Sequence, residues 1–304
     1  MKLEEFLTLT QEQLFKMLCK KYDGKSIFCK GDFIFVKGDA PVMLVAHLDT
    51  VHSETVKTIC RSDDNNILMS PEGIGGDDRC GVYALVKAYE QCAVKPCLLF
   101  TCNEEVGGVG ADMFCQLYRQ NKFPPLFDKL KMIVEIDRRG SNDAVYYDCH
   151  NTQFENYITS KGFVTAHGSF SDISLIAPEL GLAAVNLSSG YYNAHTQHEF
   201  INRSELETVI KKVVEMVGDS VRANFPKFEY AEKIFGLSRF NDFDDFYDDF
   251  YIEVSPENDQ LYEELLDVYD ADELNDLISQ HGEGVLKDLY KSCYGLWITD
   301  FDEK

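Results

Sequence analysis

The sequence is poor in basic residues, since 29 Lys and Arg stand against 52 Asp and Glu and leave a formal net charge of −23. Nucleic acids and anionic membranes bind basic surfaces, so this balance argues against both as partners. The sequence also lacks an apolar run of transmembrane length, and its first residues lack the apolar core of a secretory signal. We therefore expect a cytoplasmic protein that binds neither nucleic acid nor membrane.

The 10 cysteines include no Cys-x-x-Cys pair. This excludes a zinc ribbon, and their scatter along 304 residues is unlike the dense disulfide framework of a small secreted protein. We expect reduced thiols. The apolar content of 45% is enough for a full core, and the length fits one large domain with or without an appendage.

Apolar runs without alternation are separated by segments of helical periodicity. This order predicts an α/β fold, in which a mostly parallel mixed sheet is sandwiched by helices. The Gly31-Asp32 pair predicts a hairpin before the first run, and Ser204 with Glu207 predicts a capping box for the last long helix. The runs are 42–46, 97–101, 132–136 and 182–187, and the predicted helices are 3–21, 78–92, 109–120, 172–177 and 203–225.

The composition changes near residue 226. Residues 240–259 are acidic and aromatic, and the pattern after them predicts two or three short helices. We therefore assign 1–225 to the α/β domain and 226–304 to an acidic linker with a small helical C-terminal appendage.

Ligand-type side chains follow the apolar runs. Ligands of a doubly wound sheet bind outside the carboxyl ends of its strands, so we expect these side chains to converge. Imidazole and carboxylate groups without thiolate suit Zn²⁺, with Mn²⁺, Fe²⁺ or Co²⁺ as alternatives. The residues are His47 and Asp49 after the first run, Asp77 and Asp78 before the first long helix of the α/β domain, Glu104 and Glu105 after the second run, Asp137 after the third and His195 after the fourth.

This set is too large for a single tetrahedral zinc with an open position. It suits two ions about 3.5–4 Å apart that share one carboxylate and clamp a water and a substrate oxygen. Of two adjacent glutamates, one can bind an ion while the other takes the proton of the water. Asp49 lies two residues after His47, which suits a carboxylate that orients the imidazole through its other ring nitrogen.

Five motifs carry a family resemblance: AHLDTV, GGDDRCGV, NEEVGGVGA, EIDRRG and NAHTQHEF. In this order, between residue 42 and about residue 200, they resemble the co-catalytic dinuclear zinc exopeptidases, a clan that includes tripeptidase T, acetylornithine deacetylase and the zinc aminopeptidases. The resemblance implies a zinc exopeptidase-like core. The segments between the motifs are too short for the inserted lid of the tripeptidase and deacetylase groups, so we expect a compact, lid-less form.

The resemblance also implies residue roles. One zinc would be held by His47, Asp77 and Asp137, and the other by Asp77, Glu105 and His195. The bridge is assigned to Asp77 rather than Asp78 because the clan places a glycine four residues later, here Gly81. Glu104 resembles the general base, and Asp49 the carboxylate that orients His47.

Four further residues lie near these motifs. Arg138 follows Asp137 and is expected either to bind a substrate carboxylate or to neutralise the acidic cluster. Asp172, with Ser171 before it, is expected to support the site or to line the substrate pocket; the alternative is that this pair caps the short helix 172–177. His198 and His52 are expected near the ions rather than on them, because five ligands are already found.

These features together predict a zinc-dependent metallohydrolase, most simply an aminopeptidase that cleaves short peptides with two Zn²⁺ (or Mn²⁺ or Co²⁺), a metal-bridging water and Glu104 as general base. An N-acyl amino acid deacylase or carboxypeptidase with the same site is the alternative enzyme. A non-catalytic metal-binding interaction module is the alternative of another class. The sequence leaves the oligomeric state open.

Overall fold

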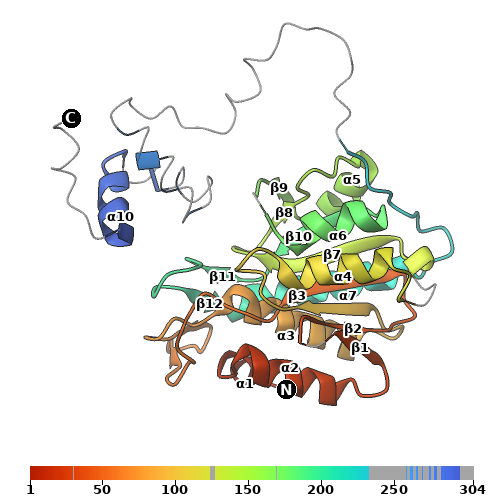
Figure 1. The fold of residues 1–304 in the computed structure, drawn as a ribbon, viewed down its shortest axis with the longest axis horizontal. Coiled ribbons are helices and arrows are strands. Elements are labelled where there is room, and N and C mark those ends of the chain that lie inside the picture. The colour runs from red at the N-terminus through yellow and green to blue at the C-terminus, as the bar shows by residue number, and fades with distance from the viewer. Residues whose placement is uncertain are drawn as a thin grey trace, which may run out of the picture. The chain divides into compact units, whose positions relative to one another are not determined.

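The computed structural model describes residues 1–29, 31–123, 127–168 and 170–232, together with residues 258, 261–262, 265, 269, 274, 277–278 and 282–294 (Figure 1). The chain divides into two compact units, and described residues 1–166 and 170–232 form the first. Over the described residues, every helix is too short or too polar to cross a bilayer.

The first unit is built on an eight-stranded mixed sheet. The four central strands run parallel, and antiparallel pairs join the outer strands to them on both sides. The predicted hairpin around Gly31-Asp32 is confirmed, since the first two strands pair antiparallel. In spatial order the strands are β1 (Ser26–Cys29), β2 (Phe33–Val36), β6 (Cys97–Thr101), β3 (Val42–His47), β7 (Met132–Arg138), β10 (Ala184–Ser188), β8 (Asp143–Val145) and β9 (Val164–Ala166).

The central strands are buried on both faces, which explains their unbroken apolar runs. Every residue of β3 is buried. Successive side chains enter different cores: Leu44 joins the core that includes α3 and α7, and Val45 joins the core that includes α4 and α6 (Figure 1). The predicted helix-covered sheet is thus confirmed. The helices are α1 (Leu3–Leu7), α2 (Gln11–Lys21), α3 (Gly76–Gln91), α4 (Val109–Arg119), the 3-10 turn η1 (Phe127–Lys129), α5 (Thr152–Ser160), α6 (Asp172–Leu180) and α7 (Arg203–Ser220).

Two helix predictions were wrong in detail. The single helix predicted over 3–21 is broken, because Thr10 caps a new helix by accepting a hydrogen bond from Gln13 N. The predicted capping box of Ser204 and Glu207 does not start α7. Its N-cap is Asn202, which supplies a side-chain acceptor closer to the start of the helix.

A second, four-stranded antiparallel sheet was not predicted. Its strands are only two or three residues long, which is too short for a periodic pattern. This sheet brings the loop 193–199 against the segment 70–77, far away in sequence. Its order is β11 (Tyr191–Tyr192), β12 (Phe200–Asn202), β5 (Ile67–Met69) and β4 (Cys60–Arg61).

The chain between Asp137 and His195 builds the same unit rather than a separate lid. Its described residues form β8, α5, β9, α6, β10 and β11 in succession. The core is therefore compact, as the short spacing of the motifs predicted.

The described residues after 225 fall into two parts. Phe228 is buried against Phe154 and Tyr157, and Glu229 bridges Leu182. Residues 226–232, which the sequence placed with the appendage, therefore pack on the first unit. In the second unit, α10 (Val285–Tyr294) is described, whereas the acidic stretch at 240–257 lies outside the described residues. A separate apolar cluster is formed there by Leu261, Tyr262, Leu265, Leu274, Ile278, Leu286 and Tyr290.

Candidate metal centre

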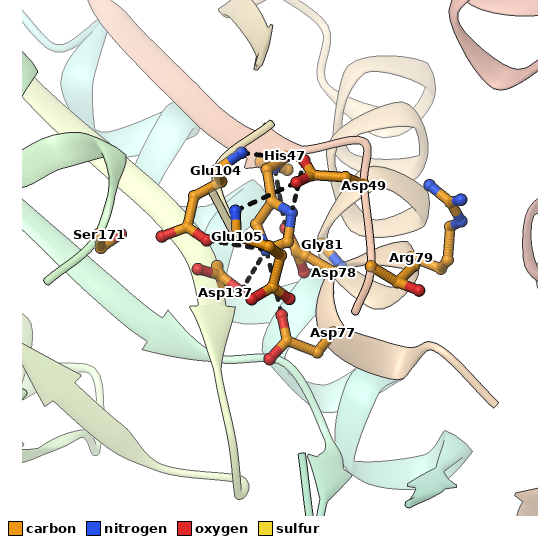
Figure 2. Close-up of polar contacts among 12 residues, drawn as sticks. His47, Asp49, Asp77, Asp78, Arg79, Gly81, Glu104, Glu105, Asp137 and Ser171 are labelled. Carbon is orange, nitrogen blue, oxygen red and sulfur yellow. Dashed lines mark hydrogen bonds and ion pairs between the residues drawn. The ribbon is translucent and has the colours of Figure 1, made fainter. Parts of the chain in front are cut away.

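Acidic and imidazole side chains from three strand ends meet at one edge of the large sheet. The strands β6, β3 and β7 are parallel neighbours, so their carboxyl ends lie side by side. His47 is the last residue of β3, Glu104 and Glu105 follow β6, and Asp137 lies near the end of β7. Figure 2 shows these side chains gathered around a common centre with that of Asp77, from the start of α3.

The first group is formed by His47, Asp77 and Asp137. The Nε2 atom of His47 lies 3.1 Å from Oδ1 of Asp77 and 3.4 Å from Oδ1 of Asp137. One atom from each side chain lies close enough to the other two for a shared ion.

The second group is formed by Asp77, Glu105 and His195. The Nε2 atom of His195 lies 3.3 Å from Oδ2 of Asp77 and 3.2 Å from Oε2 of Glu105. His195 belongs to the loop between β11 and β12 and has a left-handed backbone, with φ +62°. Each oxygen of Asp77 thus faces a different histidine, which is the arrangement of a bridging carboxylate.

Asp78 does not face the two histidines but accepts hydrogen bonds from the backbone. It is fully buried, and its oxygens accept hydrogen bonds from the backbone N–H groups of His47 and Gly81, at 3.2 and 2.8 Å. A side chain at Gly81 would collide with Asp78 and with the carbonyl of Ile136. Asp78 therefore joins the start of α3 to the end of β3 while Asp77 faces the two histidines.

Asp49 connects the two adjacent glutamates to His47. Its oxygens accept hydrogen bonds from the backbone N–H groups of Glu104 and Glu105, both at 3.1 Å. Oδ1 also lies 3.3 Å from Nδ1 of His47. Burial opposes ionisation of Asp49, but the contact with His47 and the two N–H groups outweigh it and lower the pKa of this carboxyl.

Burial and close charges shift the protonation of the cluster. Burial raises the pKa of Glu104 to about 9 and that of Asp137 to about 7. Burial also disfavours a charged imidazole, yet hydrogen bonds that the imidazole donates to the carboxylates of Asp77 and Glu105 raise the pKa of His195 to about 12. Asp137 has the corresponding effect on His47, whose pKa is also raised. Without a cation the cluster therefore holds protons.

The residues fit a pair of divalent cations. Oδ1 of Asp137 and Oε1 of Glu105 are buried atoms for which the described residues offer no well-aligned hydrogen-bond donor. Such atoms are costly to bury unless something else satisfies them. Two imidazoles and several carboxylates without a thiolate are also the donors that zinc, manganese and cobalt accept in proteins.

A buried network of hydrogen bonds holds the backbone of Asp137 in place. The side chain of Asn186, on β10, accepts a hydrogen bond from Asp137 N at 2.9 Å and donates one to Asp137 O at 3.2 Å. It also donates to Ser171, which donates in turn to Glu135. Asn186 and Glu135 were not predicted from the sequence as residues of the site. Their signal is a polar residue inside an apolar strand.

The other predicted residues lie around the cluster. Asp172 is fully buried and bonded to Thr101. Ser171 occupies the predicted N-cap position of α6, but its side chain makes no capping hydrogen bond. Arg138 follows Asp137 at the end of β7, and its carbonyl accepts from Ser189 N at 2.7 Å. His198 is exposed in the loop that carries His195 and belongs to neither ligand group.

A cavity of about 560 Å³ opens beside the cluster. Asp49 and Glu105 line it on the side of the acidic cluster, and Val51 and Val106 add apolar surface. Its far wall is the corner between α1 and α2, residues 7–11. A cavity of this size suits a small molecule or a short peptide.

Comparisons with known proteins bear on the fold. No family model matches the sequence, and no curated protein matches it. Solved structures do match. An aminopeptidase PepT from Bacillus cereus superposes with a TM-score of 0.56 at 14% identity, over 72% of this chain and 97% of that one.

A tripeptidase from Staphylococcus aureus gives a TM-score of 0.55 at 14% identity, over 71% and 95%. A TET aminopeptidase from a marine-sediment thaumarchaeon gives 0.53 at 11% identity, over 71% and 96%. The chain therefore has the α/β fold of these peptidases, as predicted from its motifs.

Proposed function

We propose that this chain is a metal-dependent exopeptidase, an aminopeptidase that removes residues from short peptides. It would use two divalent ions, for which Zn²⁺ is the first choice and Mn²⁺ or Co²⁺ the alternatives. One observation carries the proposal: the two oxygens of Asp77 face His47 and His195 separately. A carboxylate placed in this way joins two ligand groups into one dinuclear site. The likeness in fold to a tripeptidase and two aminopeptidases supports the substrate class.

Bound ions supply Lewis acidity and lower the pKa of water to near neutrality. The protein side chains perform the proton transfers. Glu104 takes a proton from the attacking water as the new C–O bond forms, and gives it to the amine nitrogen as the C–N bond breaks. Its Oε2 lies 3.9 Å from Nε2 of His47, so it reaches the first group. Asp49 holds both the imidazole and the backbone of Glu104 in place.

The cavity beside Asp49 and Glu105 is the proposed substrate site. It is large enough for one or two residues of a peptide, and it has no inserted lid above it in the described part of the chain. The apolar side chains of Val51 and Val106 would contact substrate side chains. The proposal assigns residues 1–232 to the catalytic unit.

The test is hydrolysis of tripeptides and aminoacyl p-nitroanilides by protein loaded with Zn²⁺, with and without a chelator. N-acetylated tripeptides serve as matched substrates. We expect cleavage of peptides with a free amine, loss of activity with chelator, and recovery when zinc is restored.

Two results would redirect the proposal. Release of acyl groups or of C-terminal residues, with no dependence on a free amine, would make the protein a deacylase or carboxypeptidase. Bound zinc without turnover of any amide would favour a non-catalytic binding module.

A further inference from the structure

Glu199 is a fully buried acid outside the ligand set. It follows His195 by four residues and directly precedes β12. An ionised carboxylate is costly to bury unless it is paired and hydrogen-bonded, so its partners show what it holds.

The Glu199 carboxylate is hydrogen-bonded to His52, Gly75 and Asp77, which lie on the segments that lead to the cluster. Oε1 accepts a hydrogen bond from Asp77 N at 2.9 Å, and Oε2 accepts one from Gly75 N at 2.8 Å. Oε2 also lies 2.9 Å from Nε2 of His52. Both oxygens are therefore engaged, two of the three contacts being backbone groups of the turn that presents Asp77.

The packing around this turn leaves no room for adjustment. Gly75 has a left-handed backbone, with φ +62°. A Cβ atom on Gly76 would lie 2.7 Å from Cβ of Tyr191 and 3.1 Å from Oε1 of Glu199. A Cβ atom on Gly73 would collide with the ring of His52. Glycine permits the close approach that these contacts need.

We propose that Glu199 is the positioning residue that sets Asp77 against His195, and that His52 is its side-chain hydrogen-bond partner. This inference rests on the proposed function, in which Asp77 bridges two ions. All residues of the loop 193–198 are exposed except Ala194, which is partly buried against the core, so apolar packing contributes little to fixing His195. Glu199 closes that loop at its base and fastens it to the turn of Asp77. One carboxylate thereby links ligands that are more than a hundred residues apart in sequence.

An ordinary buried ion pair would also explain the contact between His52 and Glu199. The two explanations differ in what a substitution changes. A purely structural pair affects the free energy of unfolding, whereas a positioning residue affects ion binding even when the fold is intact. Loss of a group that orients a metal ligand typically weakens metal binding by about 10- to 100-fold.

The experiment compares the full chain with Glu199→Gln, His52→Ala and Glu72→Gln. Glu72 is the matched control, because it lies in the same segment but bonds to Ser70, Lys57 and Thr58, away from Asp77. Zn²⁺ binding is measured by calorimetry, the absorption spectrum is recorded with Co²⁺, and circular dichroism of the chelated protein checks the fold.

We expect Glu199→Gln to weaken binding of at least one ion by about 10- to 100-fold and to alter the Co²⁺ spectrum. His52→Ala should have a smaller effect in the same direction, and Glu72→Gln should bind as the unsubstituted protein does. Unchanged affinity and spectrum in a folded Glu199→Gln protein would overturn the role. If that variant does not fold, His52→Ala decides, and unchanged binding there rejects the inference. An unsubstituted protein that binds fewer than two ions would refute both the proposed function and this inference.

Discussion

The two ligand groups that share Asp77 are built in different ways. His47 ends a fully buried strand, and only 1% of its side chain is exposed. His195 lies on a hairpin loop with 41% of its side chain exposed and a left-handed backbone. The sheet fixes the first histidine, whereas contacts at the base of a loop fix the second.

This difference suggests a division of labour within the site. Within the His47 group, His47 and Asp137 are held by strand pairing and by buried hydrogen bonds to Asp78 and Asn186. The His195 group depends on tertiary contacts made by short strands and by Glu199. We expect the ion of the His195 group to exchange faster and to be lost first in a chelator titration.

The largest expected effect concerns Glu104, which lies beside both groups and is a ligand of neither in the proposed site. Glu104→Gln removes the proton acceptor, so kcat should fall by about 10²- to 10⁴-fold while both ions stay bound. Steady-state kinetics with metal analysis checks this. Glu12→Gln, at an exposed surface acid, is the control, and full activity of Glu104→Gln would contradict the mechanism.

The next largest effect distinguishes the His47 group from the His195 group. His47→Ala and His195→Ala should each weaken the binding of one ion. The loss of affinity should exceed the about 10- to 100-fold that is typical when a residue that only orients a metal ligand is removed. His47→Ala should also lower the thermal stability of the chelated protein, since Asp77 and Asp137 stay buried without their imidazole. His195→Ala should lower that stability by a smaller amount, because the side chain of His195 is 41% exposed whereas that of His47 is 1% exposed. Calorimetry and thermal melts of the two variants test this prediction. Equal melting temperatures of the two chelated variants would show that the two groups do not differ in stability.

Ion binding should also depend on pH. The pKa of His195 is raised to about 12, so its imidazole is charged at neutral pH until a cation displaces the proton. Zn²⁺ affinity should therefore rise from pH 6 to 8 by roughly tenfold per unit for each proton released. Calorimetry in buffers of different ionisation enthalpy counts those protons. His195→Ala should release fewer, and an equal count would show that His195 does not exchange its proton for the ion.

The smallest effect concerns stability of the supporting residues. Asn186→Ala leaves the buried N–H of Asp137 without its acceptor and should cost about 1–3 kcal/mol of unfolding free energy. Thr196→Ala, on the exposed loop of His195, should change it by no more than about 0.5 kcal/mol. Urea denaturation of the chelated proteins gives both values. A larger loss of unfolding free energy for Thr196→Ala than for Asn186→Ala would reverse the comparison between the His195 group and the His47 group.

The sequence was most informative where local patterns decide structure. The apolar runs predicted β3, β6, β7 and β10 because strands covered on both faces are apolar throughout. The position of polar residues after these runs then indicated where His47 and Asp137 would lie. The break at Thr10 was missed although Thr10 and Gln13 form a capping box, a pattern that is visible in the sequence.

The second small sheet and Glu199 could not be predicted for a different reason. Strands of two or three residues have no period to detect. The bonds of Glu199 to Gly75 and Asp77 arise only when segments distant in sequence are brought together. Glu199 looked like one of many surface acids, and its burial is a property of the folded molecule.

The corner between α1 and α2 has a bearing on how such a protein could change during evolution. Thr10 fixes the corner as a helix cap, and the side chain of Gln11 is hydrogen-bonded to Asn103. Leu9 lines the cavity from the same corner, yet it binds no ion and belongs to no strand. Substitutions in residues 7 and 9–11 could therefore reshape the cavity without touching the His and carboxylate cluster on its other side.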